Sequence, residues 1–231
     1  MKRVAFTLLC SVVLSSSAVA QDTEKLAMDA YSSGPWLASA DPVYLAAMKK
    51  YGSCAAGSNR FQSNMVLSAL PESKASFKAL FWMLLGSNSC AGTDRTPDAA
   101  PRYYRGIVAE YFFKKHFAGS VAKGKPQVQR VYDEPKAEKL AKLSAETVEA
   151  VAMIRFGQCV STADPAGVLA VFETHYGSAE ERAALAAIGP SRARCLEPGS
   201  IHRMNPFQLR SYLAEGAYRR AASELRQRKH A

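Results

Sequence analysis

The spacing of four cysteines constrains this chain more than any other feature of its sequence. Cys54 and Cys90 are 36 residues apart, as are Cys159 and Cys195, and each member of the second pair follows its counterpart by 105 residues. Two equal intervals predict an internal duplication in which each copy is one supersecondary unit. A unit that closes on itself gives the disulfides Cys54–Cys90 and Cys159–Cys195, each adding on the order of 4 kcal/mol of stability. Four cysteines allow three connectivities, and the swapped pairings remain open.

Shifting the chain on itself by 105 residues, without a gap, extends the match well beyond the cysteines. Sixteen identities fall within the 79 positions from Ser39 to Phe117. They include a glycine, a proline and an Arg–Glu pair, which accidental matches between alanine-rich helices would not bring into one register. The matched residues that carry the argument are Gly52 with Gly157, Pro101 with Pro206, Arg105 with Arg210, and Glu110 with Glu215.

Apolar residues recur at helical spacing in both copies, and no stretch has the sustained two-residue alternation of a strand. Asp164-Pro165 is typical of an N-cap followed by proline in the first turn, and Ser178 with Glu181 is typical of a capping box. We therefore predict an all-α protein of two tandem helical repeats, each of about four helices and one disulfide. We expect Gly52 and Gly157 near a helix end, and each disulfide to join the end of the first helix to the loop after the third.

The first twenty residues have the order of a secretory signal peptide. Lys2 and Arg3 precede an apolar run, and Ala18-Val19-Ala20 offers an Ala-x-Ala cleavage site. The run is too short for a permanent anchor, and no later segment reaches about eighteen uninterrupted apolar residues. We therefore expect an exported protein, periplasmic or secreted, without a transmembrane anchor. An even number of cysteines after cleavage suits such an oxidising compartment.

Glycine and proline are concentrated between the two copies, among lysine and glutamine, which predicts an exposed linker. The expected boundaries are a signal peptide (1–20), an N-terminal arm (21–38), helical repeat 1 (39–118), the linker (119–136) and helical repeat 2 with a basic C-terminal tail (137–231).

The second copy resembles a group of exported proteins of Gram-negative bacteria with cysteine-flanked helical repeats. The motifs that carry the resemblance are Gly157-x-Cys159, Asp164-Pro165, Ser178-x-Glu180-Glu181, Cys195, and Leu209-Arg210 followed by Leu213-Ala214-Glu215. The first copy departs from the pattern, because Asn59-Arg60 stands where the second has Asp-Pro. The resemblance implies export and a helical repeat, and it implies no activity, cofactor or catalytic residue.

The chain is basic, with 30 lysines and arginines against 20 acidic side chains. Its net charge of +10 falls to +8 when Lys2 and Arg3 leave with the signal peptide. An exported protein with this charge meets mostly anionic surroundings. We therefore expect an anionic envelope component or an acidic protein as its partner, and no nucleic acid, which is a poor candidate outside the cytoplasm.

The duplicated Arg–Glu pair is the most informative polar feature. Five residues of helix turn through about 500°, so Arg105 and Glu110 point roughly 140° apart and cannot easily touch each other. The arginines must therefore reach the end of a neighbouring helix or bridge the two repeats. Glu110 precedes Lys114 by four residues, as Glu215 precedes Arg219, which predicts a surface ion pair in each copy.

Each copy also has a basic doublet near the end of its last helix. Basic residues at this place favour the helix macrodipole, and two such doublets also suit an anionic partner. The residues that we predict to contact that partner are Arg105, Lys114, Lys115, Arg210, Arg219 and Arg220.

Motifs for chemistry are missing from the sequence. It has no Cys-x-x-Cys, no Gly-x-Ser-x-Gly and no phosphate loop, and its histidines do not share a helix face at metal-ligand spacing. We therefore predict no catalytic residue, metal site or cofactor, and a binding or scaffold protein. Two alternatives remain. One is a hydrolase-type enzyme with a site between the repeats, using Glu110, Glu215 or the arginines. The other is a peripheral protein at an anionic membrane face, which requires exposed apolar residues beside the basic doublets.

Overall fold

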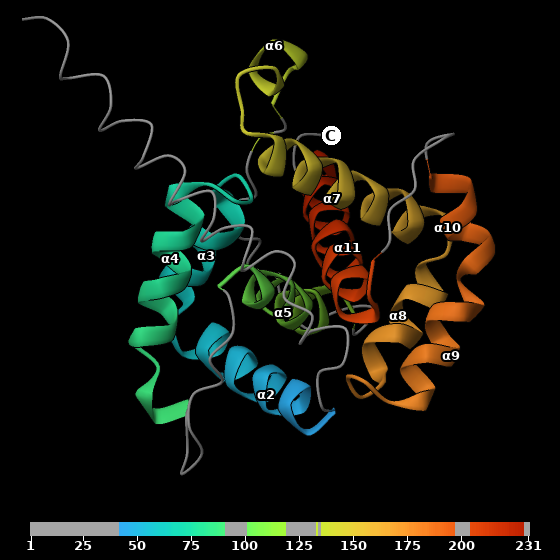
Figure 1. Ribbon diagram of the computed structural model, residues 1–231, viewed down its shortest axis with the longest axis horizontal. Helices are drawn as coiled ribbons and strands as arrows, with labels where there is room; N and C mark the ends of the chain where they lie inside the picture. The colour runs from blue at the N-terminus through green and yellow to red at the C-terminus, as the bar shows by residue number, and fades with distance from the viewer. Residues whose placement is uncertain (1–41, 91–100, 119–132, 134, 197–203, 229–231) are drawn as a thin grey trace, which may run out of the picture. The chain divides into compact units, whose positions relative to one another are not determined.

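The computed structural model describes residues 42–90, 101–118, 133, 135–196 and 204–228, and every regular element in these ranges is helical (Figure 1). The all-α prediction is therefore confirmed. The expected signal peptide, N-terminal arm and most of the linker lie outside the described residues, as does the end of the basic tail. None of the described helices combines the length and the apolar character needed to cross a lipid bilayer.

The helices form two runs along the chain. The first consists of α2 (Pro42–Ser58), α3 (Arg60–Ser68), α4 (Lys74–Leu85), the 3₁₀ turn η2 (Asn88–Cys90), α5 (Pro101–Phe113) and the π-helical turn η3 (Lys114–Ala118). The second consists of α6 (Ala137–Leu140), α7 (Ala145–Ala163), α8 (Pro165–Glu173), α9 (Ala179–Ala187), α10 (Gly189–Cys195) and α11 (Pro206–Arg228). A short helix, α10, thus stands where we expected a loop around Cys195.

The caps that the sequence suggests do begin helices. The carboxylate of Asp164 accepts a hydrogen bond from the backbone N–H of Gly167 at 2.8 Å, which fixes the start of α8. The hydroxyl of Ser178 accepts from the N–H of Glu181 at 3.0 Å and begins α9. Glu181 departs from the capping-box pattern, because its carboxylate accepts from the N–H of Gly177 at 2.6 Å, one residue before the cap.

α5 and α11 lie side by side, α2 packs on α5, and α7 crosses α11 (Figure 1). Most side chains on their facing sides are apolar, so the core lies along these four helices. Core side chains that are at most 1% exposed include Met48 of α2, Tyr104, Ile107, Val108 and Phe112 of α5, Val151 and Ile154 of α7, and Leu213, Ala217 and Tyr218 of α11.

Two glycines permit the close crossing of α7 and α11. A Cβ atom on Gly157 would lie 2.1 Å from the backbone oxygen of Tyr212, and one on Gly216 would lie 2.3 Å from the backbone nitrogen of Gln158. Gly52 lies inside α2 and faces the ring of Tyr104. The expectation that Gly52 and Gly157 lie near helix ends is therefore wrong: the close packing of a neighbouring helix, not helix termination, requires them.

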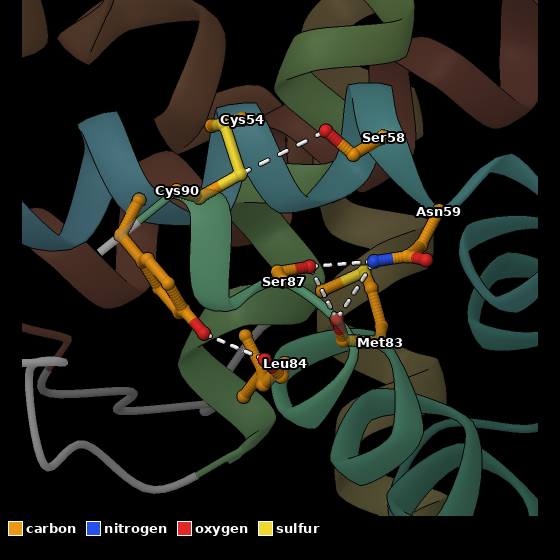
Figure 2. Close-up of a disulfide and its surroundings, with 8 residues drawn as sticks. Cys54, Ser58, Asn59, Met83, Leu84, Ser87 and Cys90 are labelled. Carbon is orange, nitrogen blue, oxygen red and sulfur yellow. Dashed lines mark hydrogen bonds between the residues drawn. A yellow bond between two sulfur atoms is a disulfide. The ribbon is translucent and has the colours of Figure 1, made fainter. Parts of the chain in front are cut away.

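Both disulfides form in the pairing that joins each unit to itself. Cys54 pairs with Cys90 and Cys159 with Cys195, each with a Cα–Cα distance of 5.7 Å. Figure 2 shows that Cys54, in the second half of α2, reaches Cys90 at the end of η2. Two such bonds suggest an oxidising compartment, which agrees with export.

Candidate functional site

Two reciprocal ion pairs join α5 to α11. Arg105 of α5 donates from Nε and Nη2 to both carboxylate oxygens of Glu215, at 2.7 and 2.6 Å. Arg210 of α11 donates from the same two nitrogens to both carboxylate oxygens of Glu110, each at 2.8 Å. Paired, charge-assisted bonds of this fork geometry are among the strongest polar contacts in proteins. Each helix therefore supplies one arginine and one glutamate to the other.

Both arginines also bind the helix hairpins beside them. Arg105 donates to the backbone oxygen of Val66, to the oxygen of Ala69 at 3.1 Å and to the hydroxyl of Ser76 at 2.9 Å. Ala69 is the residue at the C-terminal end of α3. We expected the arginines either to reach a neighbouring helix end or to bridge the two repeats. Arg105 reaches the end of α3 and also bridges the two runs of helices.

Arg210 makes the same kind of contacts with the second hairpin. It donates to the backbone oxygen of Thr174, at the C-terminal end of α8, at 3.2 Å, and to the oxygen of Phe172 at 3.0 Å. Its Nη1 donates to Glu181 at 2.9 Å. The side chain is 0% exposed. Its guanidinium group is thus fully engaged inside the protein.

The glutamates are buried as well. Burial alone would raise the pKa of Glu110, but the hydrogen bonds and charge of Arg210 outweigh it, with help from Lys49 at 3.2 Å, and hold this pKa below its usual value. Tyr176 donates its hydroxyl to the same carboxylate at 2.8 Å, and burial keeps the pKa of that hydroxyl well above its usual value. The predicted surface pairs of Glu110 with Lys114 and of Glu215 with Arg219 are therefore wrong, because both carboxylates are inside.

A small cleft of about 70 Å³ opens beside the pair formed by Arg105 and Glu215. Tyr103, Gln208 and Tyr212 contribute to its lining, as does Glu72. Glu72 adopts a positive φ of 55°, a conformation that is uncommon outside glycine. The cleft lies between α5, α7 and α11. The hydrolase alternative requires a site of this kind, between the two expected repeats.

The basic doublets lie in different surroundings. Lys114 bonds to the backbone oxygen of Phe172 at 3.0 Å and to Glu173 at 3.1 Å. Lys115 is exposed and bonds to the hydroxyl of Tyr111 at 3.0 Å. Of the second doublet, Arg219 is buried and Arg220 pairs with Glu224 at 3.3 Å. Of the six residues predicted to contact a partner, Arg105, Arg210 and Arg219 thus lie inside, and Lys115 is the most accessible.

The structure also presents an apolar surface that we did not predict. The large side chains of Phe61 and Met65 on α3, and of Phe81, Trp82 and Leu85 on α4, are exposed. We call these five residues the hairpin patch. Apolar residues three and four apart predict a buried helix face, so their spacing gave no sign that they face outward.

Among the residues that the structure describes, no group of histidine, cysteine, aspartate and glutamate side chains is arranged to hold a metal ion. No protein-family model, curated protein or solved structure matches the chain.

Proposed function

We propose that the mature chain is an exported scaffold or binding protein, periplasmic or secreted, whose two tandem helical repeats form a rigid support for an anionic partner. The observation that carries this proposal is the pair of reciprocal ion pairs between α5 and α11. Buried charges with several hydrogen-bond partners each are fixed in place. The duplicated arginines and glutamates thus hold the helices together, and exposed residues such as Lys115 contact the anionic partner.

Contacts that recur at the 105-residue shift support the tandem repeat. Each arginine bonds to the C-terminal end of the first helix of the preceding hairpin and to a residue in the first turn of the second helix. Glu72 and Gly177, which also match at this shift, both have positive φ, at 55° and 74°. The matched contacts are Arg105 with Ala69, Ser76 and Glu215, and Arg210 with Thr174, Glu181 and Glu110.

The hydrolase alternative finds less support in this site. A general acid near neutral pH needs a carboxyl group with a raised pKa. The pKa of Glu110 is lowered instead, and both oxygens of Glu215 accept from Arg105. The membrane alternative gains support, because exposed apolar residues lie on α3 and α4.

The proposal predicts that the mature protein co-sediments with isolated cell envelopes and that added salt releases it, because exposed charges are screened. Lys115→Glu is expected to weaken the binding severalfold. Lys139→Glu on α6 changes the charge equally at another exposed place and is the matched control. Binding that ignores both salt and Lys115→Glu, or no binding by the folded protein, would overturn the proposal.

A further inference from the structure

The hairpin patch is unusual for a surface. Its five side chains are between 44% and 71% exposed, and the rings of Phe81 and Trp82 touch edge to face at 5.5 Å. Single exposed apolar residues are common, but a group of large ones on two adjacent helices marks an interaction site. α3 and α4 pack against each other, so the five residues belong to one hairpin.

The fold itself does not require these bulky residues. At the 105-residue shift, Phe61 and Met65 match Ala166 and Ala170 on α8, while Phe81 and Trp82 match Ala186 and Ala187 on α9. Leu85 matches Pro190 on α10. All five matched residues are exposed too. The same surface therefore exists on the second hairpin, built from small side chains.

Positive charge accompanies the patch. Arg60, Lys74 and Lys78 are exposed on the same two helices, and Glu72 is the one acidic residue in the sequence from 60 to 85. Their matched residues in the second hairpin are uncharged: Pro165, Ala179 and Ala183. The apolar and the basic residues thus occur together on the first hairpin, and the second chain segment has small or uncharged residues at the matched places.

Lys115, the exposed residue of the first basic doublet, extends the basic surface formed by Arg60, Lys74 and Lys78. Lys115 bonds to the hydroxyl of Tyr111, and the same hydroxyl lies 2.7 Å from where a Cβ atom on Gly57 would be. Gly57 precedes Arg60, the first residue of α3, by three positions. Burial is the main cause that lowers the pKa of His116, and the charges of Lys115 and Arg60 lower it further. Lys115 is therefore close to the start of the hairpin.

The hairpin is held in a fixed shape. The side-chain amide of Asn59, just before α3, donates to the backbone oxygen of Met83 at 3.1 Å and to the hydroxyl of Ser87 at 2.6 Å (Figure 2). The disulfide between Cys54 and Cys90 holds the segment after α4 against α2 (Figure 2). These contacts tie both ends of the hairpin, so the patch is presented without a cost of ordering it on binding.

We propose that the hairpin of α3 and α4 docks on an anionic lipid surface. Aromatic and aliphatic side chains enter the headgroup boundary while lysine and arginine meet the phosphates, which is how peripheral proteins bind such surfaces. A soluble anion would use the cations and leave the five apolar side chains in water. A lipid surface uses both. This inference rests on the proposed function and names its partner.

Tryptophan fluorescence provides the first test. The chain has two tryptophans, so Trp36→Phe leaves Trp82 as the only one. With vesicles of phosphatidylglycerol and phosphatidylcholine, we expect the emission of Trp82 to shift to the blue and brominated lipid to quench it. Vesicles of phosphatidylcholine alone and inorganic phosphate are expected to leave the emission unchanged. A shift with phosphate alone would assign the site to a soluble anion and overturn the lipid proposal.

Co-sedimentation with the same vesicles separates the two contributions. Phe81→Ala with Trp82→Ala is expected to weaken binding about tenfold or more, and Lys74→Ala with Lys78→Ala roughly fivefold per lysine, less at high salt. These alanines are what the second hairpin has at the same places. Val148→Ala, an exposed apolar residue on α7, and Lys139→Ala are the controls and are expected to bind like the parent protein.

Each failure has a distinct meaning. If the folded protein ignores phosphatidylglycerol vesicles but still binds envelopes in a salt-sensitive manner, the lipid inference is wrong and the proposed function stands. If envelope binding is also missing, the proposed function is wrong. Vesicle binding that survives all four alanine substitutions would place the lipid contact elsewhere and overturn the assignment to this hairpin.

Discussion

At the scale of single residues, two arginines and two glutamates decide how the helices meet. Arg105 and Arg210 each bridge to the opposite helix and bind the C-terminal end of the first helix of a neighbouring hairpin. Sequence geometry excluded contact within each Arg–Glu pair, which was sound, because five residues of helix separate the two side chains around the axis. The sequence did not reveal that each arginine contacts both the end of a neighbouring helix and the opposite run of helices. It also favoured the i,i+4 pairs of Glu110 with Lys114 and of Glu215 with Arg219, because helix spacing says nothing about burial.

Removing one charge from a buried pair leaves the other without its partner. Glu215→Gln is therefore expected to lower the free energy of unfolding by about 3–5 kcal/mol in urea denaturation. Glu224→Gln, which breaks the more exposed pair with Arg220, is expected to cost no more than about 1 kcal/mol. Equal losses for the two variants would contradict a structural role for the pair of Arg105 and Glu215.

Acid is expected to weaken the same network. The pKa of Glu110 is lower in the folded protein than the ordinary value of 4.5, so below this value the unfolded chain binds more protons. The contribution of Glu110 is thus present above about pH 4.5 and is lost as the pH falls through the folded-state pKa. Glu110→Gln should flatten the fall in stability between pH 5 and lower values, as measured by urea unfolding across that range. An unchanged slope would show that Glu110 does not titrate with folding.

At the scale of elements, the crossing of α7 and α11 depends on the absence of a side chain. Gly157→Ala would bring a methyl group against the backbone of Tyr212, so helices must move apart. We expect a loss of about 1–3 kcal/mol in the free energy of unfolding. Gly189→Ala in α10 has no atom within 4 Å of the new Cβ and is the matched control, with no loss expected. A neutral Gly157→Ala would mean that this crossing is not tightly packed.

The sequence predicts some elements much better than others. Asp164-Pro165 and Ser178 carry their own signals, since a polar cap before a helix acts locally. Asn59 has the same opportunity at the start of α3 but bonds instead to Met83 and Ser87 of the neighbouring helix end, which no local rule reveals. The run from Phe77 to Leu85 is almost entirely apolar, so its pattern could not separate the buried Leu80 and Met83 from the exposed Phe81 and Trp82.

At the scale of the whole molecule, two disulfides close loops of equal length. Loop closure restricts the unfolded chain, so Cys54→Ser with Cys90→Ser and Cys159→Ser with Cys195→Ser should each cost a similar amount, up to about 4 kcal/mol. Guanidinium unfolding of the two double variants measures both losses. A large loss for one and none for the other would count against two equivalent closed units.

A comparison of the exposed residues of the two hairpins bears on both the repeat proposal and the lipid proposal. If both hairpins serve the same structural purpose, then the residues that differ between their exposed faces belong to function. Four exposed apolar residues of the first hairpin have alanine as their counterpart in the second, which defines a variant that the chain itself already tolerates at equivalent places.

The measurement that tests this account most directly is envelope binding by the variant with Phe61, Met65, Phe81 and Trp82 all changed to alanine. Its free energy of unfolding should remain within about 1 kcal/mol of the parent value, because surface substitutions change stability little. We predict that binding is lost while the fold is kept. Full binding by the folded variant would contradict the account, and so would unfolding of the variant, because the fold would then require the patch.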